Sequence, residues 1–317
     1  MANFISCDWG STNLRIRLVQ GDTGKVVAEE RSDEGIVQTH ARWKEQKMEE
    51  NKRIPFYFSI LQKYISKIEK DKGLSLSNEK VIISGMASST LGMMEIPYKE
   101  CPFSLEGSGL PMKKILSSRE VYLISGVRTK DDIMRGEETL LAGCADQLKT
   151  DGFVICPGTH SKHIVVKGGE CISFRTYMTG EFFCLLAFNS SLATCIVENK
   201  KMAPQEIQKY FLQGVEDSRK GQLLQLSFSV RTSVLLKQRK PEQNFYYLSG
   251  LLIGTELLTL PGLDSLFIIG SPSLLEPYQQ ALTFLFPSLP VTFVDEQEAI
   301  IKGQINIYHA HSVTQLR

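Results

Sequence analysis

The sequence predicts an α/β protein of two domains, and three observations lead to this prediction. The chain has 317 residues, which is long for one hydrophobic core and suits two domains of roughly 150 residues each. Short apolar strands alternate with segments of helical spacing. A pattern of strand, turn, strand, turn, strand begins near residue 3 and again near residue 152, with Gly and Thr in each first turn. We therefore place one domain at 1–150 and the other at 151–317.

Composition and charge narrow the class of protein. Hydrophobic residues make up 42% of the chain and charged residues 22%, as in ordinary globular proteins. A formal net charge of +1 argues against nucleic acid or an anionic membrane as a partner. No apolar run approaches the roughly 20 residues that span a bilayer, and the chain begins directly with a strand rather than a signal peptide. The seven cysteines form no Cys-x-x-Cys pair, so we expect reduced, buried thiols in a cytoplasmic protein.

The first domain opens with a hairpin whose turn suits phosphate binding. An apolar strand ends at Asp8, a Gly-Ser-Thr turn follows, and apolar and polar residues alternate again from Leu14. Gly10 permits close approach of the backbone to a ligand, while Ser11, Thr12 and backbone N–H groups are donors for phosphate oxygens. Asp8 lies where a carboxylate would hold a hydrated Mg²⁺ against those phosphates. An ordinary hairpin with polar turn residues is the alternative.

The rest of the first domain alternates between strands, loops and helices. The charged segment 40–53 predicts a solvated helix or loop, and the Pro- and Gly-rich segment 96–111 predicts a surface loop. The other expected elements are, in chain order, a strand at 25–30, an amphipathic helix at 56–70, strands at 81–84 and 121–125, and a helix at 134–148.

Two features of this domain indicate a ligand site. The small-residue loop 85–89 follows the carboxyl end of a strand, where open α/β sheets bind ligands. Glu137 and Glu138 lie in the first turn of the helix at 134–148, where acids also favour the helix dipole. Either carboxylate could therefore take part in a reaction, or it could only stabilise the N-terminus of the helix.

The second domain repeats the opening of the first. A strand at 153–156 leads into a turn at 157–162, and strands follow at 163–167 and 171–177. A turn at 270–274 begins a helix. Ser271, which precedes Pro272, can therefore be interpreted simply as the N-cap of this helix. The remaining expected elements are helices at 179–189, 204–214, 242–260 and 296–308 and strands at 265–269 and 290–294.

Five sequence blocks carry a resemblance to a known family. The chain resembles the 2-dehydro-3-deoxygalactonokinase family, within the actin-like ATPase and sugar kinase superfamily, in the same order from residue 4 to about 305. Two domains that each open with a three-stranded antiparallel unit are typical of that architecture. The blocks are Asp8–Arg15, Met134–Thr139, Pro157–Lys162, Phe174–Glu181 and Leu248–Gly254.

The resemblance implies a fold and an activity. The expected fold is the two-domain actin-like ATPase (ribonuclease H-like) fold, in which each domain is a mixed five-stranded sheet with helices on both faces. The expected activity is transfer of a phosphoryl group from ATP, with Mg²⁺, to the terminal 6-hydroxyl of 2-dehydro-3-deoxy-D-galactonate in D-galactonate catabolism. Another sugar acid as substrate, an exopolyphosphatase-like phosphohydrolase and an assembly-type ATPase remain alternatives, and a homo-oligomer is left open.

The same architecture implies roles for individual residues. It places the nucleotide between the domains, with its phosphates against both first turns. The second turn has Cys156-Pro157 where the pattern usually has an acid, so the metal role falls on Asp8. The expected base is Glu138 or Glu137, with Glu138 favoured. The expected phosphate-binding residues are Gly10, Ser11, Thr12, Asn13, Gly158, Thr159 and His160.

Two further groups complete the expected site. A flat adenine base needs close backbone approach, so Gly270 and Ser271 are expected at the adenosine. A sugar acid needs a cation for its carboxylate, and the planar fork of Arg suits it best. Arg15 could instead pair with an acid in the sheet, and Arg135 with the neighbouring glutamates. The candidate substrate-binding residues are Arg15, Arg135, Lys162, Arg175 and Ser88.

Overall fold

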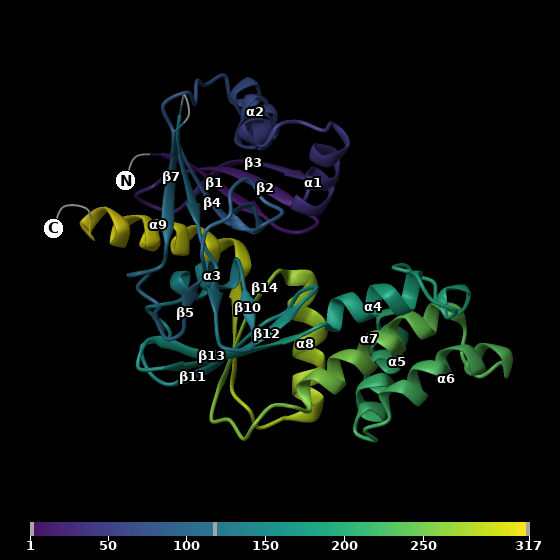
Figure 1. Ribbon diagram of the computed structural model, residues 1–317. Coiled ribbons are helices and arrows are strands. Elements are labelled where there is room, and N and C mark those ends of the chain that lie inside the picture. The colour runs from purple at the N-terminus through teal and green to yellow at the C-terminus, as the bar shows by residue number, and fades with distance from the viewer. Residues whose placement is uncertain (1–2, 117–118, 315–317) are drawn as a thin grey trace. The chain divides into compact units, whose positions relative to one another are not determined.

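The structure, a computed structural model, describes residues 3–116 and 119–314 (Figure 1). The chain divides into two compact units. Unit 1 comprises Met1–Asp151, Val165–Phe174 and Glu296–Arg317, and unit 2 comprises Gly152–Ile164 and Arg175–Asp295. The first crossing between the units thus falls next to residue 150, but a short segment and the C-terminal helix return to unit 1. The outer ends of the expected domains, residues 1 and 317, lie outside the described residues.

Unit 1 is built on a mixed sheet with the strand order β3-β2-β1-β4-β8-β7. Its first three strands are a continuous antiparallel meander, because β1 pairs with β2 and β2 with β3. β4 runs parallel to β1, and β8 parallel to β4. The strands are β1 (Phe4–Trp9), β2 (Leu14–Val19), β3 (Val26–Ser32), β4 (Lys80–Gly85), β7 (Met112–Leu116) and β8 (Glu120–Ile124).

The second six-stranded sheet, which contains the first strand of unit 2, has the same strand order around that strand. The sheet runs β15-β14-β11-β12-β13, and β14 lies parallel to both β11 and β15. The short strand β6 (Phe103–Ser104) pairs with Glu170 and Cys171 at the start of β13, a stretch that belongs to unit 1. The strands are β11 (Gly152–Cys156), β12 (Ser161–Lys167), β13 (Glu170–Tyr177), β14 (Leu266–Gly270) and β15 (Val291–Asp295).

The structure is an α/β fold with mixed sheets, but the expected five strands per sheet are not confirmed. The described residues form sheets of six, three and six strands. Most of the additional strands have only two residues, which is too short for an alternating pattern to be visible in a sequence. Two of them lie in the segment predicted as a loop. The short strands are β5 (Lys99–Glu100), β6, β9 (Val127–Arg128) and β10 (Ile133–Met134).

Helices pack against the two six-stranded sheets. In unit 1, α2 buries one apolar side against the first sheet, where Tyr57, Leu61 and Ile65 meet strand residues such as Ile5 and Leu18. The unit 1 helices are α1 (Ile36–Glu45), α2 (Arg53–Lys72), α3 (Glu137–Gly143) and α9 (Glu296–Thr314). The unit 2 helices are α4 (Thr179–Phe188), α5 (Pro204–Ser218), α6 (Leu223–Leu235), α7 (Pro241–Leu257) and α8 (Pro272–Leu285).

In the described residues of each unit, a pair of helices lies in direct backbone contact: α3 with α9 in unit 1 and α5 with α7 in unit 2. A Cβ at Gly143 of α3 would lie 1.8 Å from the carbonyl oxygen of Ala299 in α9, and a Cβ at Gly303 would lie 1.8 Å from that of Thr139. In unit 2, a Cβ at Gly250 of α7 would lie 1.9 Å from the carbonyl oxygen of Phe211 in α5. Real Cβ atoms do not approach so closely. Glycine at these positions therefore fixes α3 against α9 and α5 against α7.

The cysteines and the helix lengths bear on two further expectations. All seven cysteines are free thiols; Cys101 is half-buried, Cys184 is exposed and the others are buried. Among the described residues, no helix combines the length and the apolar character that crossing a membrane requires.

Candidate functional site

The backbone of the first turn of unit 1 is fixed by its own hydrogen bond and by the start of α1. The N–H of Gly10 donates to the carbonyl oxygen of Asn13 at 2.9 Å. The first N–H groups of α1 also reach the turn, Ile36 to the carbonyl of Gly10 at 3.0 Å and Val37 to that of Ser11 at 3.1 Å. Thr12 and Asn13 are exposed. The turn therefore holds a set shape while its tip stays accessible.

Gly35 makes this support possible. It precedes α1, and a Cβ there would lie 2.3 Å from the carbonyl carbon of Thr12. The two backbones are thus in contact, which only glycine allows. The role of Gly35 has no local signal in the sequence, because its partner turn lies more than twenty positions earlier in the chain.

Asp8 stands at the carboxyl end of β1, paired with Arg15. Nη1 of Arg15 lies 2.9 Å from Oδ2 of Asp8 and 2.7 Å from Oε1 of Glu296, the first residue of α9. The Asp8 side chain is 15% exposed. Arg15, one candidate for the substrate carboxylate, is thus engaged by two acids, the pairing that the sequence left open. Glu296 as a partner was not foreseen, since 281 positions separate it from Arg15.

The two glutamates of α3 have different environments. Glu138 is completely buried; its Oε2 accepts from the N–H of Gly136 at 2.7 Å and its Oε1 from the hydroxyl of Thr139 at 3.0 Å. Burial, followed by the nearby charge of Glu137, raises the pKa of Glu138 to about 7. Glu137 is half-exposed and accepts from the N–H of Arg135 at 3.0 Å. A carboxylate with this pKa can accept a proton at neutral pH.

The start of α3 lies beside the carboxyl end of β4. Gly136 has φ 111°, and a Cβ on it would lie 3.5 Å from the Cα of Gly85. Gly85 in turn pairs with Trp9 in the parallel register of β4 and β1. The residue after Asp8, the end of β4 and the start of the glutamate helix therefore meet at one edge of the unit 1 sheet.

Arg135 is held at this edge by Ser88 and Tyr98. Its Nη1 donates to the carbonyl oxygen of Ser88 at 2.6 Å and to the Ser88 hydroxyl at 2.7 Å. Its guanidinium lies 4.1 Å from the centroid of the Tyr98 ring, and its Nε is buried without a hydrogen-bond partner in the described part of the chain. Tyr98 was not anticipated, because its segment reads as a surface loop.

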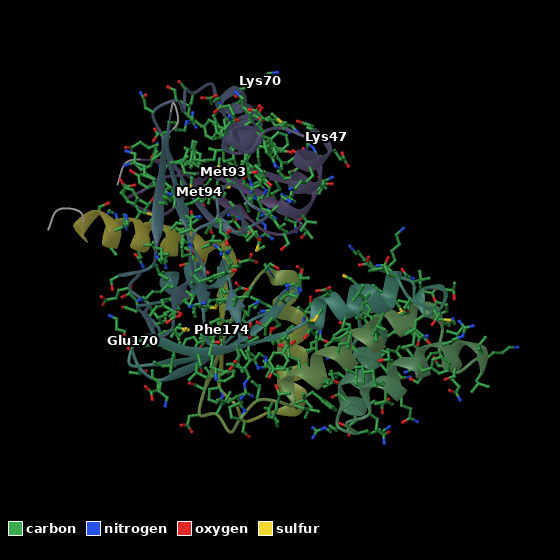
Figure 2. All side chains as sticks on the ribbon, viewed as in Figure 1. Lys47, Lys70, Met93, Met94, Glu170 and Phe174 are labelled. Carbon is green, nitrogen blue, oxygen red and sulfur yellow. The ribbon has the colours of Figure 1, made fainter. Side chains whose placement is uncertain are left out.

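The loop that carries Ser88 is anchored by methionines. Met93 donates its N–H to the carbonyl of Ala87 at 2.7 Å and is buried in the unit 1 core, against which Met94 also packs. Figure 2 shows both side chains among the strands and helices of unit 1. The Ser88 hydroxyl additionally donates to the carbonyl oxygen of Ile124 at 2.7 Å. Ser88 is therefore a fixed part of the site edge.

The second turn, in unit 2, repeats the construction of the first. A Cβ at Gly180 of α4 would lie 2.6 Å from the carbonyl oxygen of Gly158, and the N–H of Glu181 donates to the carbonyl of Thr159 at 3.0 Å. Thr159 and His160 are exposed, and His160 pairs with the Glu181 carboxylate. Both turns are thus supported by a glycine and by the first N–H groups of a following helix.

The two cations near this turn differ in exposure. Lys162 is buried, and its Nζ donates to the carbonyl oxygen of His160 at 2.8 Å. Arg175 is exposed on β13. Lys162 thus lies close beneath the turn, whereas Arg175 faces solvent.

A cavity of about 510 Å³ lies in unit 2 beside this turn. Its walls are largely aromatic and aliphatic, as in many small-molecule sites. Gly270 and Ser271 are not among its lining residues but directly precede α8, which forms one wall; Ser271 accepts at its carbonyl the N–H groups of Leu274 and Leu275, both at 2.9 Å. Lining residues from the turn, α4, α7 and α8 include Gly158, Thr179, Gly180, Phe245, Ser273 and Pro277.

No ready-made metal cluster accompanies these residues. In the ranges 3–116 and 119–314, no three or more His, Cys, Asp or Glu side chains are grouped so that they could hold an ion. Asp8 offers a partly exposed carboxylate beside the first turn. This suits Mg²⁺, which keeps several water ligands and commonly binds through one or two carboxylates plus phosphate oxygens.

Comparisons with known proteins identify the family of the chain. A family model described as 2-keto-3-deoxy-galactonokinase matches residues 8–307. The chain is 31% identical over 312 residues to a Rhizobium meliloti (strain 1021) protein named "Probable 2-dehydro-3-deoxygalactonokinase", covering 95% of this chain and 94% of that one. It is 29% identical over 318 residues to the 2-dehydro-3-deoxygalactonokinase of Escherichia coli (strain K12), covering 98% of each.

Solved structures give the same result. The chain superposes with a TM-score of 0.81 and 29% identity on a Sinorhizobium meliloti protein described as "a putative 2-dehydro-3-deoxygalactonokinase protein", covering 98% of this chain and 96% of that one. In fold alone it is similar to the activator of 2-hydroxyisocaproyl-CoA dehydratase from Clostridium difficile, solved with bound ADPNP, with a TM-score of 0.51 and 11% identity over 99% and 98% of the chains. With the family model matching nearly its whole length, the chain belongs to the 2-keto-3-deoxy-galactonokinase family.

Proposed function

We propose that this chain is a kinase that transfers a phosphoryl group from ATP to the terminal 6-hydroxyl of 2-dehydro-3-deoxy-D-galactonate. The observation that carries the proposal is the family match over residues 8–307, which the two relatives near 30% identity reinforce. The family description, 2-keto-3-deoxy-galactonokinase, uses "keto" for the same carbonyl group that "dehydro" denotes. We further propose that the two units are the two domains of an actin-like ATPase fold and that the enzyme works in the cytoplasm.

Glu138 is the general base in this proposal. The attacking hydroxyl must lose its proton as the phosphoryl group is transferred, and a positioned carboxylate with a pKa near 7 can accept it at neutral pH. The hydrogen bonds from Gly136 and Thr139 hold the carboxylate at the start of α3, and α9 holds α3 from behind through Gly143 and Gly303. Glu137, which is half-exposed, supports the turn before the helix.

The first turn and Asp8 serve the phosphates and the metal. Gly10, Ser11 and Thr12 offer a preformed backbone to the phosphate oxygens. Asp8 would hold Mg²⁺ through its carboxylate, and the bound ion would neutralise charge on the phosphates. Arg15 keeps Asp8 oriented, because Glu296 holds the same Nη1 of the guanidinium.

Arg135 is the proposed partner of the substrate carboxylate. Its guanidinium is already fixed by Ser88 and by stacking on Tyr98, so little side-chain entropy is lost when a carboxylate binds. A planar guanidinium also matches a carboxylate with two parallel hydrogen bonds. The position beside the glutamate helix places it on the same unit as the base.

Unit 2 supplies the nucleotide site. The second turn, with Gly158 and Thr159, receives phosphate, and the adjoining 510 Å³ cavity receives the adenosine. Its aromatic walls suit a flat base, and Gly270 and Ser271 fix the start of α8 at its border.

A coupled assay that follows ADP release tests the proposal. We expect turnover with 2-dehydro-3-deoxy-D-galactonate and none with glucose or galactonate. Turnover with a different 2-dehydro-3-deoxy sugar acid would correct the substrate. Phosphate release without any sugar acid would instead indicate a phosphohydrolase, and failure with every sugar acid would overturn the proposal.

A further inference from the structure

A buried acid in unit 2 has no role in the chemistry described so far. Glu256 lies in the last turn of α7, after an apolar stretch, and its side chain is 1% exposed. Burying a carboxylate is costly unless it is paired or well hydrogen-bonded. The partners of Glu256 therefore show what the residue is for.

Four side chains donate hydrogen bonds to this carboxylate. Oε1 accepts from the hydroxyl of Ser161 at 2.7 Å and from Nε2 of His163 at 2.9 Å. Oε2 accepts from the hydroxyl of Tyr278 at 2.6 Å and from that of Thr179. A carboxylate has about four acceptor sites and no donor, so these partners saturate it and require His163 to carry its proton on Nε2.

The donors come from the elements that form the proposed nucleotide site. Ser161 and His163 begin β12 directly after the second turn. Thr179 is the first residue of α4 and precedes Gly180, whose backbone rests on that turn. Thr179 and Tyr278 both line the cavity. One carboxylate thus ties β12, α4 and α8 to the end of α7.

We propose that Glu256 is a positioning residue for the nucleotide. It holds the second turn and two walls of the adjoining cavity in the geometry that binds ATP. This inference rests on the proposed function, since it takes the turn and the cavity to be the nucleotide site. A purely structural carboxylate would stabilise unit 2 without a specific effect on nucleotide affinity.

Glu256→Gln tests the role with the least change in shape. The amide keeps one acceptor oxygen but presents N–H groups to two of the four donors, so the set cannot be satisfied as before. A net loss of one charge-assisted hydrogen bond corresponds to roughly tenfold in affinity. We expect the Kd for Mg·ADP, measured by calorimetry, and the KM for ATP to rise about tenfold, with the KM for the sugar acid unchanged.

Asn244→Ala is the matched control. Asn244 is also completely buried in α7, where it donates to the carbonyl oxygens of Val230 at 2.8 Å and Cys195 at 3.1 Å, but it is not among the residues that line the cavity. Its loss should lower the free energy of unfolding in urea while leaving the Kd for Mg·ADP near the wild-type value. Thr179→Val removes a single donor and should weaken Mg·ADP binding in the same direction as Glu256→Gln.

The outcomes separate this inference from the proposed function. Wild-type Mg·ADP affinity in Glu256→Gln, or equal weakening in Glu256→Gln and Asn244→Ala at equal loss of stability, overturns the positioning role. If Glu256→Gln does not fold, Thr179→Val decides by the same measurement. A wild-type chain that binds Mg·ADP but phosphorylates no sugar acid refutes only the substrate, whereas one that binds no nucleotide refutes both.

Discussion

At the scale of single residues, the two adjacent glutamates of α3 provide an internal comparison. Both are carboxylates in the first turn of the same helix, but Glu138 is completely buried whereas Glu137 is half-exposed. Glu138→Gln should lower kcat by about 10²-fold or more, since the base is lost, while the KM for ATP stays close to wild type. Glu137→Gln should retain most of the activity. Full activity in Glu138→Gln, measured in the coupled assay, would exclude it as the base.

The raised pKa of Glu138 predicts a pH dependence of activity. Because its carboxyl titrates at about 7 in the folded protein, kcat/KM should fall about tenfold for each pH unit below this value as the base becomes protonated. Glu137→Gln removes a neighbouring charge that contributes to the shift, so the fall should move to lower pH. A profile that is flat between pH 5 and 8 would contradict the assignment.

The same pKa predicts the sign of an effect on stability. The folded-state pKa lies above the unfolded value of 4.5, so the folded state binds the proton more tightly, and stability is lost as pH rises from about 4.5 through 7. Glu138→Gln cannot titrate, so relative to wild type it should gain on the order of 3 kcal/mol in free energy of unfolding over this range. Urea unfolding of both proteins at pH 5 and pH 8 measures the difference; a constant difference would show that the pKa is not shifted.

If Arg135 binds the substrate carboxylate, its substitution should change the KM for the sugar acid but not the KM for ATP. Arg135→Lys keeps the positive charge but loses the planar fork and the stacking on Tyr98. We expect the KM for the sugar acid to rise about tenfold or more, with the KM for ATP unchanged. Arg175→Lys, at an exposed position on β13, is the control and should have little effect. Equal effects of both substitutions would remove Arg135 from the substrate site.

At the scale of elements, each phosphate turn depends on a glycine of another segment. A Cβ at Gly35 would meet the backbone of Thr12 at 2.3 Å, and one at Gly180 would meet that of Gly158 at 2.6 Å. Gly35→Ala and Gly180→Ala should each destabilise the fold by about 1–3 kcal/mol and raise the KM for ATP by shifting a turn. Gly262→Ala, where no atom lies within 4 Å of the added Cβ, is the control, read by urea unfolding and kinetics. Wild-type KM values for ATP in both Gly35→Ala and Gly180→Ala would contradict the role of these glycines in shaping the phosphate turns.

These supporting contacts could not be predicted from the sequence, whereas the turns themselves could. Asp8 at a strand end and the Gly-Thr turn after it were predictable, because alternation and turn residues are local signals. The support from Gly35, the stacking of Tyr98 and the partners of Glu256 were not. Each of these contacts joins residues that are far apart in the chain. Ser161 and Glu256, for example, are separated by 95 positions. A lone acid after the apolar run of α7 was the one visible sign of the Glu256 network.

At the scale of the whole molecule, the two units share one plan. Beside its first strand each has two strands in the order of the chain on one side and two parallel strands on the other. The sequence revealed this repetition through the paired turns, since both openings follow the same alternation. The return of α9 to unit 1 was hidden, because helix contacts through Gly143 and Gly303 depend on tertiary packing rather than on a local pattern.

The metal role of Asp8 should be visible in the stability of the whole chain. A ligand that binds only the folded state at 100 times its Kd stabilises it by about 2.7 kcal/mol, so Mg·ATP should raise the free energy of unfolding and EDTA should remove most of that gain. Asp8→Asn should lose the gain and the turnover. Its own cost should stay below about 1 kcal/mol, because the pair with Arg15 is partly exposed, at 15% and 26%.

Asp264→Asn is the matched control for that measurement, because Asp264 is an exposed acid of unit 2. It should keep both the turnover and the stabilisation by Mg·ATP seen in urea unfolding. If Asp8→Asn behaves like Asp264→Asn, the carboxylate at the end of β1 does not hold the metal. The ion would then be bound by phosphate and water alone, and the pairing of Asp8 with Arg15 and Glu296 would serve only to join β1 to α9.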